Sequence, residues 1–247
     1  MTRFPTILLT FGILCSCTSP DKQKVGQPTQ DFKTLDTIVP FSGFWVNEFY
    51  INNIKKNKSP RLSQNVDESC ITIPNKTLQV TRMVAGFHEG AADMIVVKKN
   101  DNFYFYYKYD DTIRNLAYDI QIVSKNEIKI GKNTFIKTEE KFLEDILFSG
   151  KYLDSIGVEV QFTKDGQIIG LDSFKLYEPI YDYIDAGMDV DQIGLGTNQG
   201  KIKYYAFRFN RDTLLIYDLR CLTYDSTNKS CVIVDFGNQK YKLIKIH

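Results

Sequence analysis

Residues 158–162 read VEVQF, and the chain continues through Asp165-Gly166 into the apolar pair Ile168-Ile169. Apolar and polar residues alternate in this stretch, which is the period of an extended strand with one buried face. An Asp-Gly step between two such runs is typical of a tight β-hairpin turn. The stretch therefore predicts two antiparallel strands joined by a short turn.

The same pattern recurs along most of the chain from residue 41 onward. Residues 118–122 read YDIQI, and turn-forming residues separate this run from its neighbours. The main turn signals fall at residues 100–102, 124–126, 131–133 and 210–212. Many short strands at this spacing predict an all-β fold built from antiparallel up-and-down barrels. Only residues 139–147 are expected to form a helical turn or two, midway along the body.

A short internal repeat suggests that the body has two halves. Phe41-Ser42-Gly43 recurs as Phe148-Ser149-Gly150, and each triplet opens a β-rich stretch of about 100 residues. Each stretch divides into roughly eight short strands by its turn signals. We therefore expect two tandem halves, residues 41–140 and residues 141–247.

Gly43-Phe44-Trp45 resembles the Gly-x-Trp motif that opens the barrel of lipocalins and related calycins. The resemblance implies a small up-and-down barrel, a central apolar pocket, and a role for Trp45 in closing one barrel end. The second half carries Tyr152 at the place of the tryptophan, and neither last strand offers the arginine that covers the ring in that family. An eight-stranded barrel can hold one small ligand or be filled by its own side chains.

The first 17 residues resemble a bacterial lipoprotein signal peptide. Arg3 precedes a mostly apolar run at residues 7–14 that is too short to span a bilayer, and Leu14-Cys15-Ser16-Cys17 resembles a lipobox. The resemblance implies cleavage after residue 16 and acylation of Cys17, followed by a polar tether at residues 17–40. The alternatives are an ordinary cleaved signal peptide and a buried amino-terminal segment. With no clear acidic run after Cys17, we expect export and anchoring at the periplasmic side of the outer membrane.

Charge and cysteine content limit the chemistry of the body. With 31 basic and 30 acidic residues, the chain gives no electrostatic reason to bind nucleic acid. Cys221 and Cys231 flank a predicted hairpin turn, so they form either a disulfide or two separate thiols. Cys70, in an apolar run, is expected to be a core residue. With only two histidines and no Cys-x-x-Cys pair, the sequence predicts neither a metal site nor a cofactor.

Three segments remain as weak candidates for a binding site. His88-Glu89 lies between glycines and is either a functional pair or a solvated loop. A cluster of aspartates at residues 182, 185, 189 and 191 departs from the calcium-loop pattern and is expected to form an acidic loop. In the run of aromatic residues at 103–109, Tyr104 and Tyr106 share one face of a strand, as a stacking surface for a sugar or as a cross-strand ladder.

These observations leave three hypotheses for function. The first is a non-enzymatic binding protein for a small apolar or glycan ligand, with Trp45, Tyr104, Tyr106 and His88 as candidate contacts. The second is a structural or assembly protein of the cell envelope that contacts a protein partner, which filled barrels would favour. The third is an envelope enzyme that uses aspartates or His88 on loops.

Overall fold

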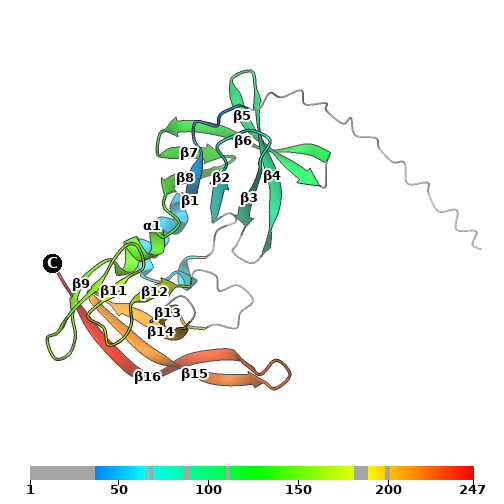
Figure 1. Cartoon of the computed structure of the whole chain (residues 1–247). Coiled ribbons are helices and arrows are strands. Elements are labelled where there is room, and N and C mark those ends of the chain that lie inside the picture. The colour runs from blue at the N-terminus through cyan, green and yellow to red at the C-terminus, as the bar shows by residue number, and fades with distance from the viewer. Residues whose placement is uncertain are drawn as a thin grey trace, which may run out of the picture.

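The protein is all-β, as the alternating pattern predicts (Figure 1). The structure is a computed structural model, and it describes residues 37–64, 66, 69–85, 89–109, 112–180, 189–197 and 201–247. Two eight-stranded antiparallel sheets follow one another along the chain, and each curls into a barrel. The predicted architecture of tandem up-and-down barrels is confirmed. No helix in these described parts is long and apolar enough to cross a membrane.

Barrel 1 is a closed sheet in which each strand pairs with its neighbours in sequence. The ring closes where β1 pairs with β8, with Trp45 opposite Lys137. Its strands are β1 Gly43–Asn47, β2 Cys70–Ile73, β3 Val80–Ala85, β4 Glu89–Lys99, β5 Asn102–Tyr109, β6 Thr112–Ser124, β7 Glu127–Ile130 and β8 Asn133–Thr138.

Barrel 2 repeats this order. The first and last strands pair, and an isolated bridge between Gln167 and Leu176 links β11 to β12, so that this sheet also nearly closes. Its strands are β9 Gly150–Leu153, β10 Glu159–Phe162, β11 Ile168–Ile169, β12 Leu176–Pro179, β13 Gln192–Gly196, β14 Ile202–Asn210, β15 Thr213–Asp225 and β16 Ser230–Ile246. The two sheets therefore share one topology.

The same set of interactions closes the start of each barrel. In barrel 1, the Trp45 indole donates a hydrogen bond to the Phe41 carbonyl oxygen at 2.9 Å, and the Lys137 ammonium lies 5.6 Å from the ring centroid. Lys137 also donates to the Ser42 carbonyl oxygen at 2.6 Å. Gly43 has φ +131°, and a Cβ there would lie 2.8 Å from Lys137 Cε. Lysine thus covers the ring where the calycin resemblance implies arginine.

Barrel 2 reproduces this arrangement with a different ring. The Tyr152 hydroxyl donates to the Phe148 carbonyl oxygen at 2.7 Å, and the Lys245 ammonium lies 5.8 Å from the Tyr152 ring centroid. Lys245 donates to the Ser149 carbonyl oxygen at 2.8 Å. Gly150 has φ +139°, and a side chain there would bring its Cβ to 2.8 Å from Lys245 Cε. Equivalent residues thus make equivalent contacts in both halves, which is strong support for an internal duplication.

One helix was not expected from the sequence. The segment Glu48–Asn57 forms helix α1 directly after β1, and the short helical turn η1, Arg61–Ser63, follows it. The Asn47 side chain accepts a hydrogen bond from the Phe49 amide, while Lys58 ends the helix in a left-handed conformation. The expectation that helical structure is confined to a turn or two at residues 139–147 is therefore wrong.

Helix α1, between β1 and β2, packs against both barrel 1 and the core of barrel 2. Its buried side chains Tyr50, Ile51 and Ile54 belong to the same apolar cluster as the core of barrel 2. The predicted helical turn near residues 139–147 appears as η2, Glu144–Phe148, and it contributes Leu147 and Phe148 to this cluster. The two halves therefore share buried surface through α1 and η2 (Figure 1).

Candidate functional site

Large side chains fill the interiors of both barrels. In barrel 1, Trp45, Phe105 and Phe135 are fully buried and pack with aliphatic residues from the surrounding strands. In barrel 2, the Phe148 ring lies 5.0 to 6.2 Å from four other aromatic rings. These four rings belong to Phe162, Tyr177, Phe207 and Phe209. Aromatic and aliphatic side chains thus pack together inside both barrels.

Trp45, a candidate ligand contact from the sequence, is a core residue. Its side chain has no exposed surface, and its only polar atom is bonded to the Phe41 carbonyl oxygen. Trp45 therefore serves to close and fill the barrel.

Tyr104 and Tyr106 lie on the outer wall of barrel 1, next to one another in a small apolar cluster with Ile95 and Val97. Tyr106 is only 6% exposed, and Lys99 covers it by donating to the phenol oxygen at 2.6 Å with its ammonium 4.8 Å from the ring centroid. Tyr106 is thus closed to a stacking ligand. Tyr104 is half-buried and borders a groove on the outer wall.

The structure brings none of the other candidate residues from the sequence together in a described site. Cys17, His88, Asp182 and Asp185 lie outside the described residues. Within the described parts of the chain, no group of three or more His, Cys, Asp or Glu side chains could hold a metal ion. Cys70 is buried in the shared core, and burial raises the pKa of its thiol to about 12, which keeps it protonated and unreactive at neutral pH.

Asp191 joins the two halves. Its carboxylate accepts a hydrogen bond from the Arg61 backbone amide at 2.9 Å, and Ser59 also bonds to it. Burial raises the pKa of Asp191, while the bonds from Ser59 and Arg61 oppose this shift. Asp189 is exposed nearby. The predicted acidic loop therefore contributes a buried structural contact at Asp191.

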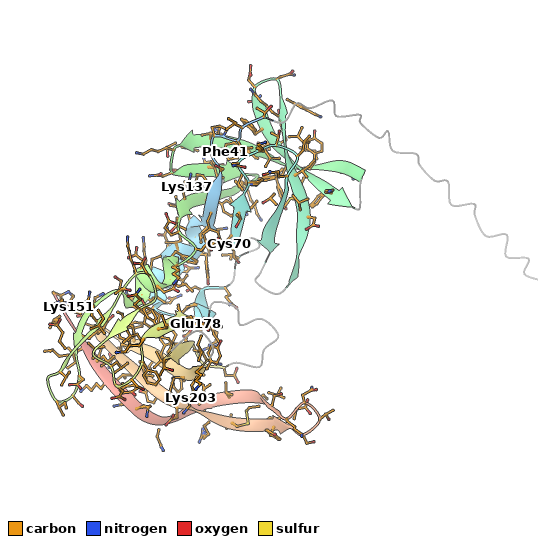
Figure 2. All side chains as sticks on the ribbon, in the orientation of Figure 1. Phe41, Cys70, Lys137, Lys151, Glu178 and Lys203 are labelled. Atoms are coloured by element: carbon orange, nitrogen blue, oxygen red, sulfur yellow. A yellow bond between two sulfur atoms is a disulfide. The ribbon has the colours of Figure 1, made fainter. Side chains whose placement is uncertain are left out.

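The most prominent surface feature is the hairpin formed by β15 and β16. Beyond the residues that pair with β14 and β9, the two strands pair only with one another among the described residues, and the ribbon extends away from the barrel (Figure 1). Lys203, on neighbouring β14, lies beside the ribbon and 3.4 Å from Asp218 of β15, whereas Phe41 lies within barrel 1, remote from the ribbon (Figure 2). The sequence predicts these strands and their turn, but not that they project.

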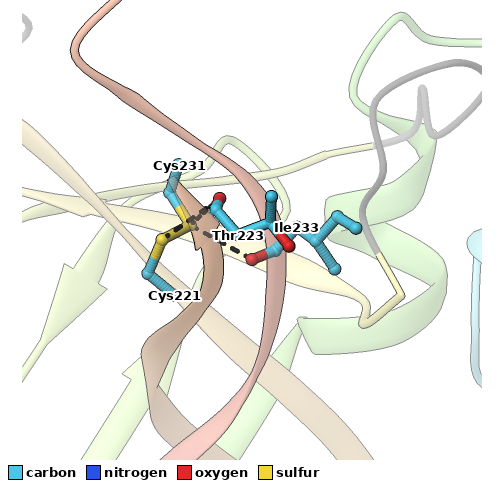
Figure 3. The surroundings of a disulfide bond; sticks show 4 residues. All are labelled: Cys221, Thr223, Cys231 and Ile233. Carbon is cyan, nitrogen blue, oxygen red and sulfur yellow. Dashed lines mark hydrogen bonds between the residues drawn. A yellow bond between two sulfur atoms is a disulfide. The ribbon is translucent and has the colours of Figure 1, made fainter. Parts of the chain in front are cut away.

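A disulfide joins Cys221 to Cys231 across this ribbon (Figure 3). The carbonyl oxygens of Thr223 and Ile233 lie 3.4 and 3.1 Å from the Cys231 sulfur. Closing a loop this short stabilises the folded hairpin by roughly 2–3 kcal/mol in the chain-entropy model. The bond fixes the end of a two-stranded ribbon, which would otherwise be only marginally ordered.

Apolar side chains are exposed next to the disulfide. Leu222 is 54% exposed, Tyr224 61% and Val232 43%. Shifts in the strand register leave Leu222 and Val232 as the extra residues of two β-bulges, one on each strand. A β-bulge changes the direction in which a side chain points, and bulges are common at sheet edges next to functional sites. We refer to Leu222, Tyr224 and Val232 as the hairpin patch.

The end of the hairpin beyond this patch is polar. The Asp225 carboxylate accepts from the Thr227 amide and from the Asn228 side-chain amide, both at 2.8 Å. These bonds lower the pKa of Asp225, because they favour its charged form. At the base of the ribbon, Arg220 and Asp235 form an ion pair at 2.6 Å. The three exposed apolar residues of the hairpin patch thus lie along the ribbon between the polar turn and the Arg220–Asp235 pair.

A cleft of about 650 Å³ lies where barrel 1 meets the segment that leads to barrel 2. Phe44 and Phe142 line its apolar side, and lysines and acidic residues alternate around the rest, including Lys137, Lys141 and Asp145. These charged side chains are of both signs. The cleft therefore favours no particular ligand.

Comparison of the chain with protein-family models, with curated protein sequences and with solved structures found no match, so the barrel assignment rests on the strand order described above.

Proposed function

We propose that this chain is a non-enzymatic protein of the bacterial cell envelope that contacts a protein partner through the hairpin patch. The observation that carries the proposal is the exposure of Leu222, Tyr224 and Val232 on a disulfide-bonded ribbon that projects from filled barrels. Aromatic and aliphatic side chains on a preorganised element are typical anchors of protein interfaces. Filled barrels favour this role over an enclosed ligand.

The polar end of the hairpin supports a protein partner over a lipid bilayer. Insertion of the hairpin patch into a membrane would first bury Asp225 and Lys229, at a high desolvation cost. A groove on a protein can receive the side of the ribbon and leave its end in water. The Arg220–Asp235 pair would then lie at the rim of the interface.

The proposal includes export and anchoring through Cys17, which rest on the lipobox resemblance alone. Acyl chains contribute about 0.8 kcal/mol per buried methylene, so several chains hold a protein on a membrane. Mass spectrometry of the protein purified from membranes is expected to find a chain that begins at Cys17 and carries acyl groups. An intact amino terminus with unmodified Cys17 would remove this part of the proposal.

The partner contact is tested by photo-crosslinking in the intact cell envelope. With the photoreactive residue p-benzoylphenylalanine at position 224, we expect one discrete crosslinked species, because this side chain lies in the patch. The same residue at position 156 is the matched control, since Ile156 is 83% exposed in the turn between β9 and β10. Adding Leu222→Ser and Val232→Ser should reduce the crosslink at least about tenfold, by removing roughly 1.4 kcal/mol or more of apolar contact.

Two results would contradict the docking role. One is the absence of any crosslink from position 224, and the other is an equal pattern from positions 224 and 156. Retention of the Cys221–Cys231 disulfide in each variant, checked by the mass after alkylation, shows that the hairpin is still formed.

A further inference from the structure

A groove on the outer wall of barrel 1 has the composition of a saccharide site. It has a volume of about 460 Å³ and lies along β5 and β6, far in the sequence from the hairpin patch. Tyr104 on β5 is the direct cross-strand partner of Asp119 on β6. Asn102 and Gln121 follow on the same outer face, because side chains two residues apart on a strand point the same way.

These four side chains form a compact polar and aromatic surface. Cross-strand partners have their Cβ atoms about 5 Å apart, so the Tyr104 ring and the Asp119 carboxylate are immediate neighbours. The Tyr104 ring packs against the outer-wall cluster of Ile95, Val97 and Tyr106, which holds it in place. A ring fixed in this way offers a flat surface without a large loss of side-chain entropy on binding.

The charges around the groove indicate the class of ligand. Half of the described side chains that line it are carboxylates or amides, and none is lysine or arginine. Of the lysines on the adjoining strand β4, Lys98 lies 3.2 Å from the Asp101 carboxylate and Lys99 donates to the Tyr106 phenol oxygen. The lining side chains themselves therefore offer an anionic ligand such as phosphate no counter-charge, and a fully apolar ligand would leave the carboxylates and amides unpaired.

A neutral saccharide matches this set of groups. Its C–H face can stack on the Tyr104 ring, while its hydroxyls donate to the Asp119 carboxylate and exchange hydrogen bonds with the Asn102 and Gln121 amides. Organic cations are usually bound by several aromatic rings that surround the charge. In this groove only the Tyr104 ring is available on the outer face, so a cation is disfavoured. We infer that the groove formed by Asn102, Tyr104, Asp119 and Gln121 binds neutral glycans, independently of the hairpin patch.

The test is a microarray of neutral oligosaccharides probed with the full mature chain. We expect the wild type to retain a defined set of glycans. Tyr104→Ala should weaken this retention at least about tenfold, a loss of about 1.4 kcal/mol. Asp119→Asn, at an exposed position, should weaken it as well, because it replaces a charged acceptor with a neutral one. Tyr204→Ala removes an exposed tyrosine on β14, outside both the groove and the hairpin patch, and should leave retention unchanged.

Two outcomes would overturn the inference. The first is a wild type that retains no neutral glycan, and the second is equal retention by wild type, Tyr104→Ala and Asp119→Asn. The fluorescence of Trp45, the only tryptophan in the chain, shows whether barrel 1 remains folded in each variant. Because the hairpin crosslink is measured separately, failure of the glycan site leaves the docking proposal standing, and the reverse also holds.

Discussion

Phe148→Ala is expected to lower the free energy of unfolding by about 3–5 kcal/mol, the range for a fully buried phenylalanine. Phe148 has no exposed surface, and its ring contacts four others at the centre of barrel 2. Alanine would leave a cavity that these large rings cannot easily fill, because their own positions are fixed by the strands. The change should appear in urea unfolding followed by far-ultraviolet circular dichroism.

The matched control is Phe49→Ala. This phenylalanine is 60% exposed on α1, so its loss should change stability by no more than about 0.5 kcal/mol. A Phe148→Ala variant as stable as Phe49→Ala would show that the barrel 2 core is not packed around Phe148. Trp45 fluorescence, followed in the same titration, reports the unfolding of barrel 1. A lower unfolding midpoint by this signal in Phe148→Ala would show that barrel 1 is also destabilised, through the core that α1 shares with barrel 2.

Trp45→Ala is expected to have a similar effect on barrel 1, also about 3–5 kcal/mol. The substitution removes the largest buried side chain of this barrel, its hydrogen bond to the Phe41 carbonyl oxygen and the ring beneath the Lys137 ammonium. Differential scanning calorimetry is the suitable measurement, since the variant has lost its only tryptophan.

Trp45→Phe separates packing from polar contact. Phenylalanine keeps much of the ring volume and loses the indole N–H, so we expect a smaller cost of about 1–3 kcal/mol. Equal costs for Trp45→Ala and Trp45→Phe would mean that the hydrogen bond to Phe41, and not the filling of the barrel, is what Trp45 provides.

The strand order could be predicted from the sequence because each barrel has one buried face. Side chains such as Val160 and Phe162 must point inward, and the alternation with polar residues fixes their register. The triplets that begin at Phe41 and Phe148 also predict the duplication. Lys137 and Lys245, which cover the Trp45 and Tyr152 rings, are not evident from the sequence. The calycin pattern has arginine at this place, and both lysines are far along the chain from the triplets.

Helix α1 escapes prediction for a different reason. Its apolar residues Tyr50, Ile51 and Ile54 follow a helical period over only two turns, and they come directly after a strand. The Asn47 cap and the basic residues of the last turn are the local signals that could have found it. The contact of α1 with the second barrel depends on long-range packing, which no local pattern contains.

The candidate sites are only partly visible in the sequence. Period two correctly places Tyr104 and Tyr106 on one face, but it cannot show that Lys99 covers Tyr106. The projection of the β15–β16 hairpin depends on where β14 and β9 stop pairing with it. Two β-bulges then decide which apolar residues face the solvent, and bulges leave no reliable mark in a sequence of this kind.

We propose that the protein acts through its outer surfaces, because large side chains of its own pack inside both barrels. The most direct test is titration of the purified wild-type protein with N-phenyl-1-naphthylamine, an uncharged dye that becomes fluorescent in apolar cavities. We predict no saturable rise in fluorescence, since residues such as Trp45 and Phe148 occupy both interiors. A saturable, stoichiometric rise that an apolar ligand can displace would contradict the account.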